Sequence, residues 1–374
     1  MSESDLTAAQ TGLEGVIVAE TQLSRVDGVN GRLVIRGIDL ERAAPELGFE
    51  GMAAHLWQES RGRLQKSLGA ARQSAFDALP QLGEALSVPD GMEALRAGVA
   101  HLPTGGDPAT ERVRIAGAMP VLAAAWARGQ GLGRKGSRSA SEREPINPDP
   151  NLGQSADYLR MLTGRTPHPA IVRGLDSYLA TVAEHGMNAS TFAARVVTST
   201  GSDGVSSVVA ALCALKGPLH GGAPGPVLDL LEAIGSPENA RARLLEELEA
   251  GRRIMGLGHR VYRVRDPRAA VLEAATLELE KAGISTRRLE LARAVEHEAA
   301  TLLRERYPDR ALEANVEFYT AVLLDTLGLD RRLFTPTFAV GRVVGWMAHI
   351  DEQRETGRLI RPSCRYVGPQ PEAA

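Results

Sequence analysis

Residues 216–222 read KGPLHGG, residues 256–262 read GLGHRVY and residues 315–319 read NVEFY. Glycines lie on both sides of His220, and Gly258 precedes His259, so the neighbouring backbone lacks Cβ atoms. Such a backbone can turn with positive φ or let a ligand approach closely. Two imidazoles and the Glu317 carboxylate can together remove a proton from carbon and stabilise the oxygen that gains charge. The three segments therefore indicate an active site.

The composition limits the class of protein. A chain of 374 residues, of which 43% are hydrophobic, can bury a large core and is expected to form two domains. Only 4% of the residues are aromatic, while Ala and Leu dominate, which favours helices. The net charge of −3 comes from interspersed acids and bases, and this argues against a nucleic-acid-binding surface.

The cysteine content and the hydropathy pattern predict a cytoplasmic protein. Cys213 and Cys364 are too few for a disulfide framework, so a reducing compartment is expected. No apolar run reaches 18 residues, and residues 1–10 are polar and acidic, unlike a signal peptide. We therefore expect no association with a membrane.

Local signals place the main elements. Residues 16–38 predict short strands with Asp-Gly and Asn-Gly turns, and the pattern becomes helical from about Asp39. Residues 129–144 are rich in Gly, Ser and basic residues, which predicts a mobile surface loop. Asp266-Pro267 predicts the start of a helix that ends before Gly283.

Thr335-Pro336 predicts the start of a later helix, which runs to about Gln353. Arg342, Trp346 and His349 are spaced by four and three residues on it and share one face. We interpret His349 as a core histidine.

These segments resemble the citrate synthase family. They are similar to its G-x-L-H-G-G loop, its G-H-R-V-Y…D-P-R segment and its N-V-D-F-Y helix start. Further similar segments are HGMNASTF at 185–192, FTP at 334–336, GWMAH at 345–349 and the tail at 358–368. The resemblance implies an all-α, mainly helical fold with short N-terminal strands. It also implies a large domain (12–221 and 328–368) and a small mobile domain (222–327).

The chain departs from the usual family pattern at three positions. Glu317 stands where the family usually has aspartate, Pro224 replaces the Asn after His-Gly-Gly-Ala, and Ser363 replaces a second arginine. A bacterial branch of the family looks similar at the first two positions. Glu317 and Pro224 make a catalytically silent, ligand-binding paralogue one alternative.

The resemblance assigns catalytic roles to three residues. Glu317 would be the base that removes the α-proton of a thioester, and the dipole of the helix beginning near Val316 would keep it ionised. His220 would donate to the thioester oxygen, and His259 would donate to the keto oxygen of the second substrate.

The resemblance also assigns the binding residues. Arg268 and Arg342 would hold oxaloacetate, assisted by His185 and by Arg361 from the neighbouring subunit of a homodimer. Arg260 would bind coenzyme A. No metal or cofactor is implied, because acetyl-CoA is a substrate.

The leading hypothesis is an acyltransferase that condenses acetyl-CoA with oxaloacetate to give citrate and coenzyme A. The closest alternative is 2-methylcitrate synthesis from propionyl-CoA, since one methylene in an apolar pocket is worth only ~1–3 kcal/mol. A third possibility is an iron enzyme that uses His220, His259 and Glu317 as ligands.

Overall fold

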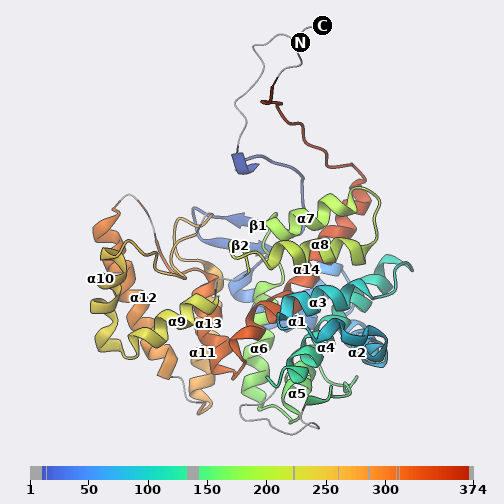
Figure 1. Ribbon diagram of the computed structural model, residues 1–374, viewed down its shortest axis with the longest axis horizontal. Coiled ribbons are helices and arrows are strands. Elements are labelled where there is room, and N and C mark those ends of the chain that lie inside the picture. Colours follow the sequence, from blue (N-terminus) through green and yellow to red (C-terminus); the bar gives the residue numbers. More distant parts are fainter. Residues whose placement is uncertain are drawn as a thin grey trace.

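The computed structural model describes residues 11–13, 15–132, 143–221, 224–259, 261–284, 287–308, 310 and 312–369. Figure 1 shows a body of packed helices with a small sheet at its edge. The segments before β1 and after α14 leave the body on the same side. The predicted fold class, all-α with short N-terminal strands, is confirmed.

The described elements follow one another in this order: η2 (Thr11–Leu13), β1 (Ser24–Asp27), β2 (Arg32–Ile35), β3 (Ile38–Asp39), α1 (Leu40–Trp57), α2 (Arg61–Asp77), η3 (Leu79–Leu86), α3 (Gly91–Ala100), α4 (Pro108–Gly129), α5 (Gln154–Thr163), α6 (Pro169–Val182), α7 (Ala189–Thr198), α8 (Gly204–Leu215), α9 (Pro224–Ile234), η5 (Pro237–Asn239), α10 (Ala240–Glu249), α11 (Pro267–Lys281), α12 (Arg287–Arg306), α13 (Val316–Thr326), η6 (Arg331–Leu333) and α14 (Phe334–Thr356).

The strands form an antiparallel sheet of order β1-β2-β3. β1 and β2 pair from Ser24↔Ile35 to Asp27↔Arg32, so residues 28–31 make the turn that the Asp-Gly and Asn-Gly pairs predict. Residues 16–20 lie outside the strands, and the strand region is therefore shorter than predicted.

Helix α14 is central to the packing. It contacts α4, α6, α7 and α8, and it is buried on all sides, as expected of a core helix. A Cβ atom on Gly345 would lie only 2.2 Å from the carbonyl oxygen of Ala183. Glycine at this position therefore lets α14 approach the end of α6 closely, which brings Arg342 beside that end.

Helices α9, α10, α12 and α13 gather at the opposite side of the molecule (Figure 1). There α9 packs on α13 and α10 packs on α12. Helix α11 begins after Asp266 and ends before Gly283, as predicted, and it contacts both α13 and α6. It therefore joins this group to the helices around α14.

Part of the predicted loop at 129–144 lies outside the described residues, since these omit 133–142. Gly129 is the last residue of α4. Among the described helices, none has the length and apolar character needed to cross a membrane.

Candidate active site

Two helix N-cap residues hold the segment 256–262 against the segment 315–319. Asn315 caps α13 by accepting a hydrogen bond from the Glu317 N–H (3.1 Å), and its Nδ2 donates to the Gly258 carbonyl (2.9 Å). Asp266 caps α11 at the Arg268 N–H (3.0 Å) and also accepts from the first N–H of α13 (3.3 Å). Gly258 has φ +82°, a conformation that favours glycine. The histidine loop and the carboxylate helix are thus held together.

His259 presents one ring nitrogen as a donor. Its Nδ1 accepts from the backbone N–H groups of Val261 (2.9 Å) and Tyr262 (3.1 Å), so the ring proton lies on Nε2. Nε2 lies 3.3 Å from Nη2 of Arg268, a nitrogen that can only donate. Burial, assisted by the charge of Arg268, lowers the pKa of His259 to about 4. A neutral imidazole and a guanidinium therefore converge as donors suited to an acceptor oxygen.

Arg268 is fixed by the residue that caps its own helix. It is buried, and its Nε (3.0 Å) and Nη2 (2.7 Å) both donate to the Asp266 carboxylate. Although burial lowers the pKa of Arg268, the Asp266 charge outweighs this and raises it. Arg268 is therefore a permanent and oriented cation.

His220 is oriented by a chain of side chains on α7 and α14. Its Nε2 lies 2.9 Å from Oγ of Ser190. The single Ser190 proton is donated to Asn188 (2.8 Å), and the Trp346 indole N–H donates to Ser190 (3.1 Å). Ser190 must then accept from Nε2–H of His220. Burial lowers the pKa of His220 to about 4, assisted by two nearby arginines, so this ring is also neutral.

Arg342 is a buried cation with an unused donor. Its side chain is almost fully enclosed, its Nε donates to the Val182 carbonyl (2.5 Å), and its guanidinium carbon lies 4.7 Å from the centre of the Phe338 ring. Its Nη2 has no hydrogen-bond partner among the described residues. Burial lowers the pKa of Arg342 to about 10, although Glu184 opposes the shift. Since an unpaired buried charge is costly, this side chain is suited to an anionic ligand.

Glu317 lies in the first turn of α13 and is only partly exposed. Burial raises its pKa more than Arg268 and its own backbone N–H lower it. Burial thus opposes the ionisation that the helix terminus favours, and the net shift of the Glu317 pKa is upward. A raised pKa brings the carboxylate closer to the pH range in which a general base is most effective.

His185 follows α6 and faces the loop that carries His259. Its Nε2 lies 3.1 Å from the Tyr262 hydroxyl, and its ring meets that of His259 edge to face, with centroids 5.7 Å apart. Burial lowers the pKa of His185 well below its usual value, and Arg268 and Arg342 add to this effect. His185 is therefore neutral.

The structure brings six of the eight predicted residues into one electrostatic cluster. The charges of Arg268 and Arg342 act on the pKa of both His185 and His220. The full set is His185, His220, His259, Arg268, Glu317 and Arg342. Of the other two predicted residues, Arg361 lies exposed in the extended segment after α14, and Arg260 falls outside the described residues.

The site also contains three residues without a predicted role, Tyr262, Ser190 and Asn188, although all three lie in the quoted segments. Their positions in the sequence could have indicated a role. Tyr262 follows His259 in a glycine-containing loop, and the other two residues lie at a helix start. Buried hydroxyl and amide groups at such positions need hydrogen-bond partners. Which partners they find depends on the fold.

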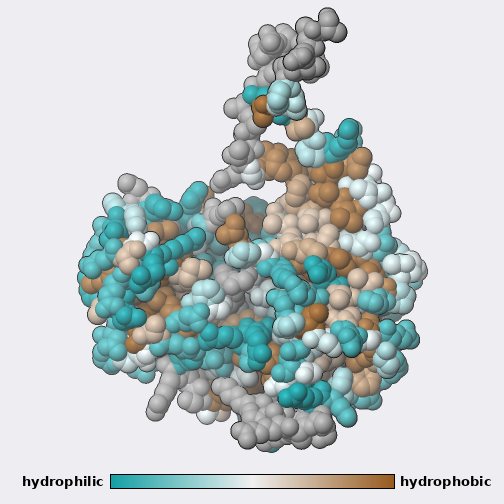
Figure 2. Space-filling model, in the orientation of Figure 1, coloured by the Kyte–Doolittle hydropathy of each residue, from teal (hydrophilic) through white to brown (hydrophobic). Residues whose placement is uncertain are grey.

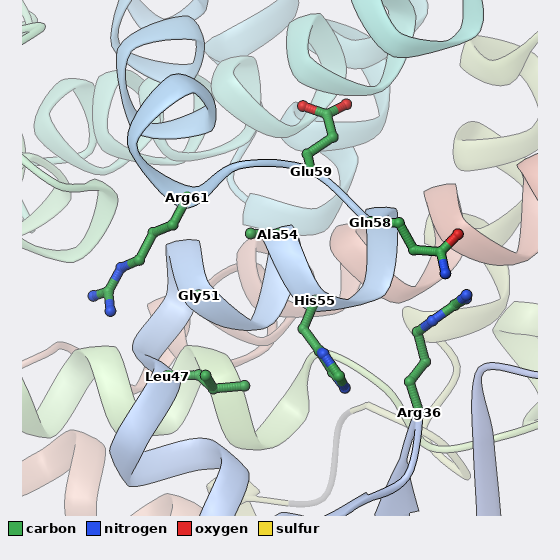
Figure 3. Close-up of a pocket in the computed structure, with 8 residues that line it drawn as sticks. All are labelled: Arg36, Leu47, Gly51, Ala54, His55, Gln58, Glu59 and Arg61. Carbon is green, nitrogen blue, oxygen red and sulfur yellow. The ribbon is translucent and has the colours of Figure 1, made fainter.

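A surface pocket of about 460 Å³ lies elsewhere, at the C-terminal end of α1 (Figure 3). It is lined by Arg36, Leu47, Gly51, Ala54, His55, Gln58, Glu59 and Arg61. None of the predicted site residues lines this pocket. The buried polar cluster, rather than this pocket, is therefore the candidate active site.

The iron-enzyme alternative is not supported. The described part of the chain contains no group of three or more His, Cys, Asp and Glu side chains placed to hold a metal ion. His259 also turns its protonated nitrogen toward the Arg268 cation, an arrangement that does not suit a metal ligand.

A helical fold with neutral imidazoles, a partly buried carboxylate and two buried arginines defines an enzyme site for acid–base chemistry on an anionic substrate. The chain belongs to the citrate synthase family, because the family model described as "Citrate synthase, C-terminal domain" matches residues 12–363. It is an enzyme of the citrate synthase type.

Individual relatives agree with this family. The chain is 37% identical to putative citrate synthase 2 of Mycobacterium tuberculosis, covering 97% of this chain and 94% of that protein. It is 36% identical to the citrate synthase of Haloferax volcanii, covering 96% and 95%. The crystal structure of citrate synthase from Thermotoga maritima superposes with a TM-score of 0.83 at 33% identity, covering 98% of both chains.

Proposed function

We propose that the enzyme condenses acetyl-CoA with oxaloacetate to give citrate and free coenzyme A. The observation that carries this proposal is the set of donors around Glu317. Nε2–H of His259, Nη2 of Arg268 and the unpartnered Nη2 of Arg342 are suited to a substrate rich in carboxylate and keto oxygens. The relatives reported above are named citrate synthases, which supports the same reaction.

In the proposed reaction, Glu317 takes the α-proton of acetyl-CoA. The enol carbon then attacks the keto carbon of oxaloacetate, and Nε2–H of His259 with Arg268 stabilises the alkoxide that forms. Water finally hydrolyses the citryl thioester to release citrate and coenzyme A. The raised pKa of Glu317 supports its role as base.

His220 would donate a hydrogen bond to the thioester oxygen. In the present arrangement its proton lies on Nε2 and is used by Ser190. Rotation of the Ser190 hydroxyl toward Nε2 would leave the ring proton on Nδ1, free for the substrate. The role of His220 is therefore coupled to the orientation of one hydroxyl.

The substrate carboxylates would be held by Arg268, Arg342 and His185, with Arg361 supplied by the neighbouring subunit. Arg361 lies in the exposed segment after α14, so a second copy of the chain could receive it. Arg260 would bind the phosphates of coenzyme A.

A homodimer is part of this proposal. The segment after α14 exposes apolar side chains, including Leu359 and Val367, that a partner could cover. Figure 2 shows hydrophobic residues gathered at the base of this segment, near α7 and α8. Val197 and Val209 are partly exposed on these helices.

We further propose that residues 12–221 and 328–368 form the large domain and residues 222–327 the small one. His185, His220 and Arg342 would then belong to the first and His259, Arg268 and Glu317 to the second. A complete site would require closure of the two domains, which would also exclude water from the thioester.

The proposed location of the enzyme is the cytoplasm. Both cysteines are free thiols, as is usual for proteins in this reducing compartment.

A thiol-release assay with each acyl-CoA tests the reaction. We expect oxaloacetate-dependent release of coenzyme A, faster with acetyl-CoA than with propionyl-CoA. The propionyl-CoA alternative is not favoured, because the relatives reported above are named citrate synthases. Binding of both substrates without any thiol release would instead identify a silent paralogue.

A further inference from the structure

We propose that Tyr262 is a positioning residue that fixes the protonation pattern of both imidazoles facing the keto acid, His185 and His259. This inference rests on the proposed function, since it assigns these rings to oxaloacetate. Tyr262 is almost fully buried between the loop after α6 and the loop before α11. Its ring lies 5.7 Å from that of His185 and 4.8 Å from that of His259, measured between centroids.

Tyr262 acts on His259 through its backbone. Its N–H donates to Nδ1 of His259 (3.1 Å), together with the N–H of Val261 (2.9 Å). Because these two donors occupy the Nδ1 lone pair, the neutral ring carries its proton on Nε2, the nitrogen beside Arg268. The effect of Tyr262 on His259 therefore does not depend on the tyrosine hydroxyl.

Tyr262 acts on His185 through its side chain. The hydroxyl proton of a buried tyrosine needs an acceptor, and the described residues offer this hydroxyl one, Nε2 of His185 at 3.1 Å. Tyr262 therefore donates, and the neutral His185 ring carries its proton on Nδ1. Nδ1–H has no hydrogen-bond partner among the described residues, so it remains available to a substrate oxygen.

A purely structural tyrosine would behave differently. Tyr319 is equally buried, but its hydroxyl donates to Glu296 (2.6 Å) rather than to an imidazole. Tyr319→Phe is therefore a matched control, because it removes a buried hydroxyl without touching either ring. Tyr262→Phe keeps the aromatic ring and the backbone N–H, and removes only the link to His185.

The first test is kinetic. For Tyr262→Phe we expect the oxaloacetate KM to rise about three- to tenfold, the value of one lost neutral hydrogen bond. The acetyl-CoA KM should stay within about twofold, because the group affected faces the other substrate. In a His185→Asn background, where an amide N–H replaces Nδ1–H, Tyr262→Phe should add no further rise.

The second test needs no substrate. Long-range ¹H–¹⁵N spectra of the histidine-labelled protein report which nitrogen of each ring carries the proton. We expect Tyr262→Phe to change the pattern of His185 and to leave that of His259 as in the wild type. An unchanged His185 pattern, or equal rises in KM for Tyr262→Phe and Tyr319→Phe, would overturn the inference. Absence of turnover in the wild type would instead contradict the proposed function.

Discussion

Replacing Arg342 by leucine should weaken oxaloacetate binding strongly, while the stability of the folded protein changes little. The guanidinium is buried, and its Nη2 has no partner among the described residues. A buried charge-assisted pair with a substrate carboxylate is worth about 2–5 kcal/mol. Since 1.4 kcal/mol is a factor of ten, the oxaloacetate KM should rise roughly 30- to 4000-fold.

The stability of the ligand-free enzyme should change much less than its affinity for oxaloacetate. Burial lowers the pKa of Arg342 from 12.5 to about 10, and one pKa unit corresponds to about 1.4 kcal/mol. The buried charge therefore costs roughly 3 kcal/mol at pH 7, a cost that fades as the pH rises through 10. Leucine removes this cost but also leaves the Val182 carbonyl without its donor. We expect the melting temperature to change by only a few degrees.

Arg195→Leu is the matched control. Arg195 is also buried, but its donors are used by Gln353 (2.9 Å), His349 (3.1 Å) and Glu352 (2.6 Å). Its loss should lower the melting temperature clearly and affect both KM values alike, because breaking a buried network costs about 3–5 kcal/mol. Steady-state kinetics and thermal melts measure both effects. Equal changes in the two KM values for Arg342→Leu, with a large loss of stability, would refute the substrate role of Arg342.

Three further predictions follow from the same geometry. Glu317→Gln should lower kcat at least ~100-fold with little change in oxaloacetate KM, and should remove the acidic limb of the pH–rate profile, which burial places above the ordinary pKa of 4.5. A variant that turns over normally would exclude Glu317 as the base. Because the pKa values of His220 and His259 fall from 6.5 to about 4, stability should decrease as the pH drops from 6.5 toward 4. Melts of His220→Asn should show a shallower decrease, and an equally steep one would contradict this origin. Oxaloacetate alone should compact the protein in solution scattering and tighten acetyl-CoA binding in calorimetry, whereas unchanged dimensions and affinity would rule out closure.

Short-range sequence signals were sufficient to predict several helix starts, one tight turn and the family. Asp266 before Pro267 and Asn315 before Val316 predict helix starts, because a capping side chain acts within three residues of its own position. Glycine beside His259 likewise predicts a tight turn, and Gly258 has the positive φ that requires it. The order of these segments also indicated the family, which the comparisons confirm.

The tertiary structure decided the chemical state of the site. The proton on His185 depends on Tyr262, 77 residues away in the chain, and the unused donor of Arg342 depends on how α14 packs against the end of α6. Glu317 lies at a helix terminus that the sequence predicts, but only the packing around this carboxyl shows that burial raises its pKa. The tautomer of a histidine and the pKa of a buried group depend on neighbours that the fold brings together from distant segments. Neither the protonated nitrogen nor the direction of a pKa shift can therefore be predicted from sequence spacing alone.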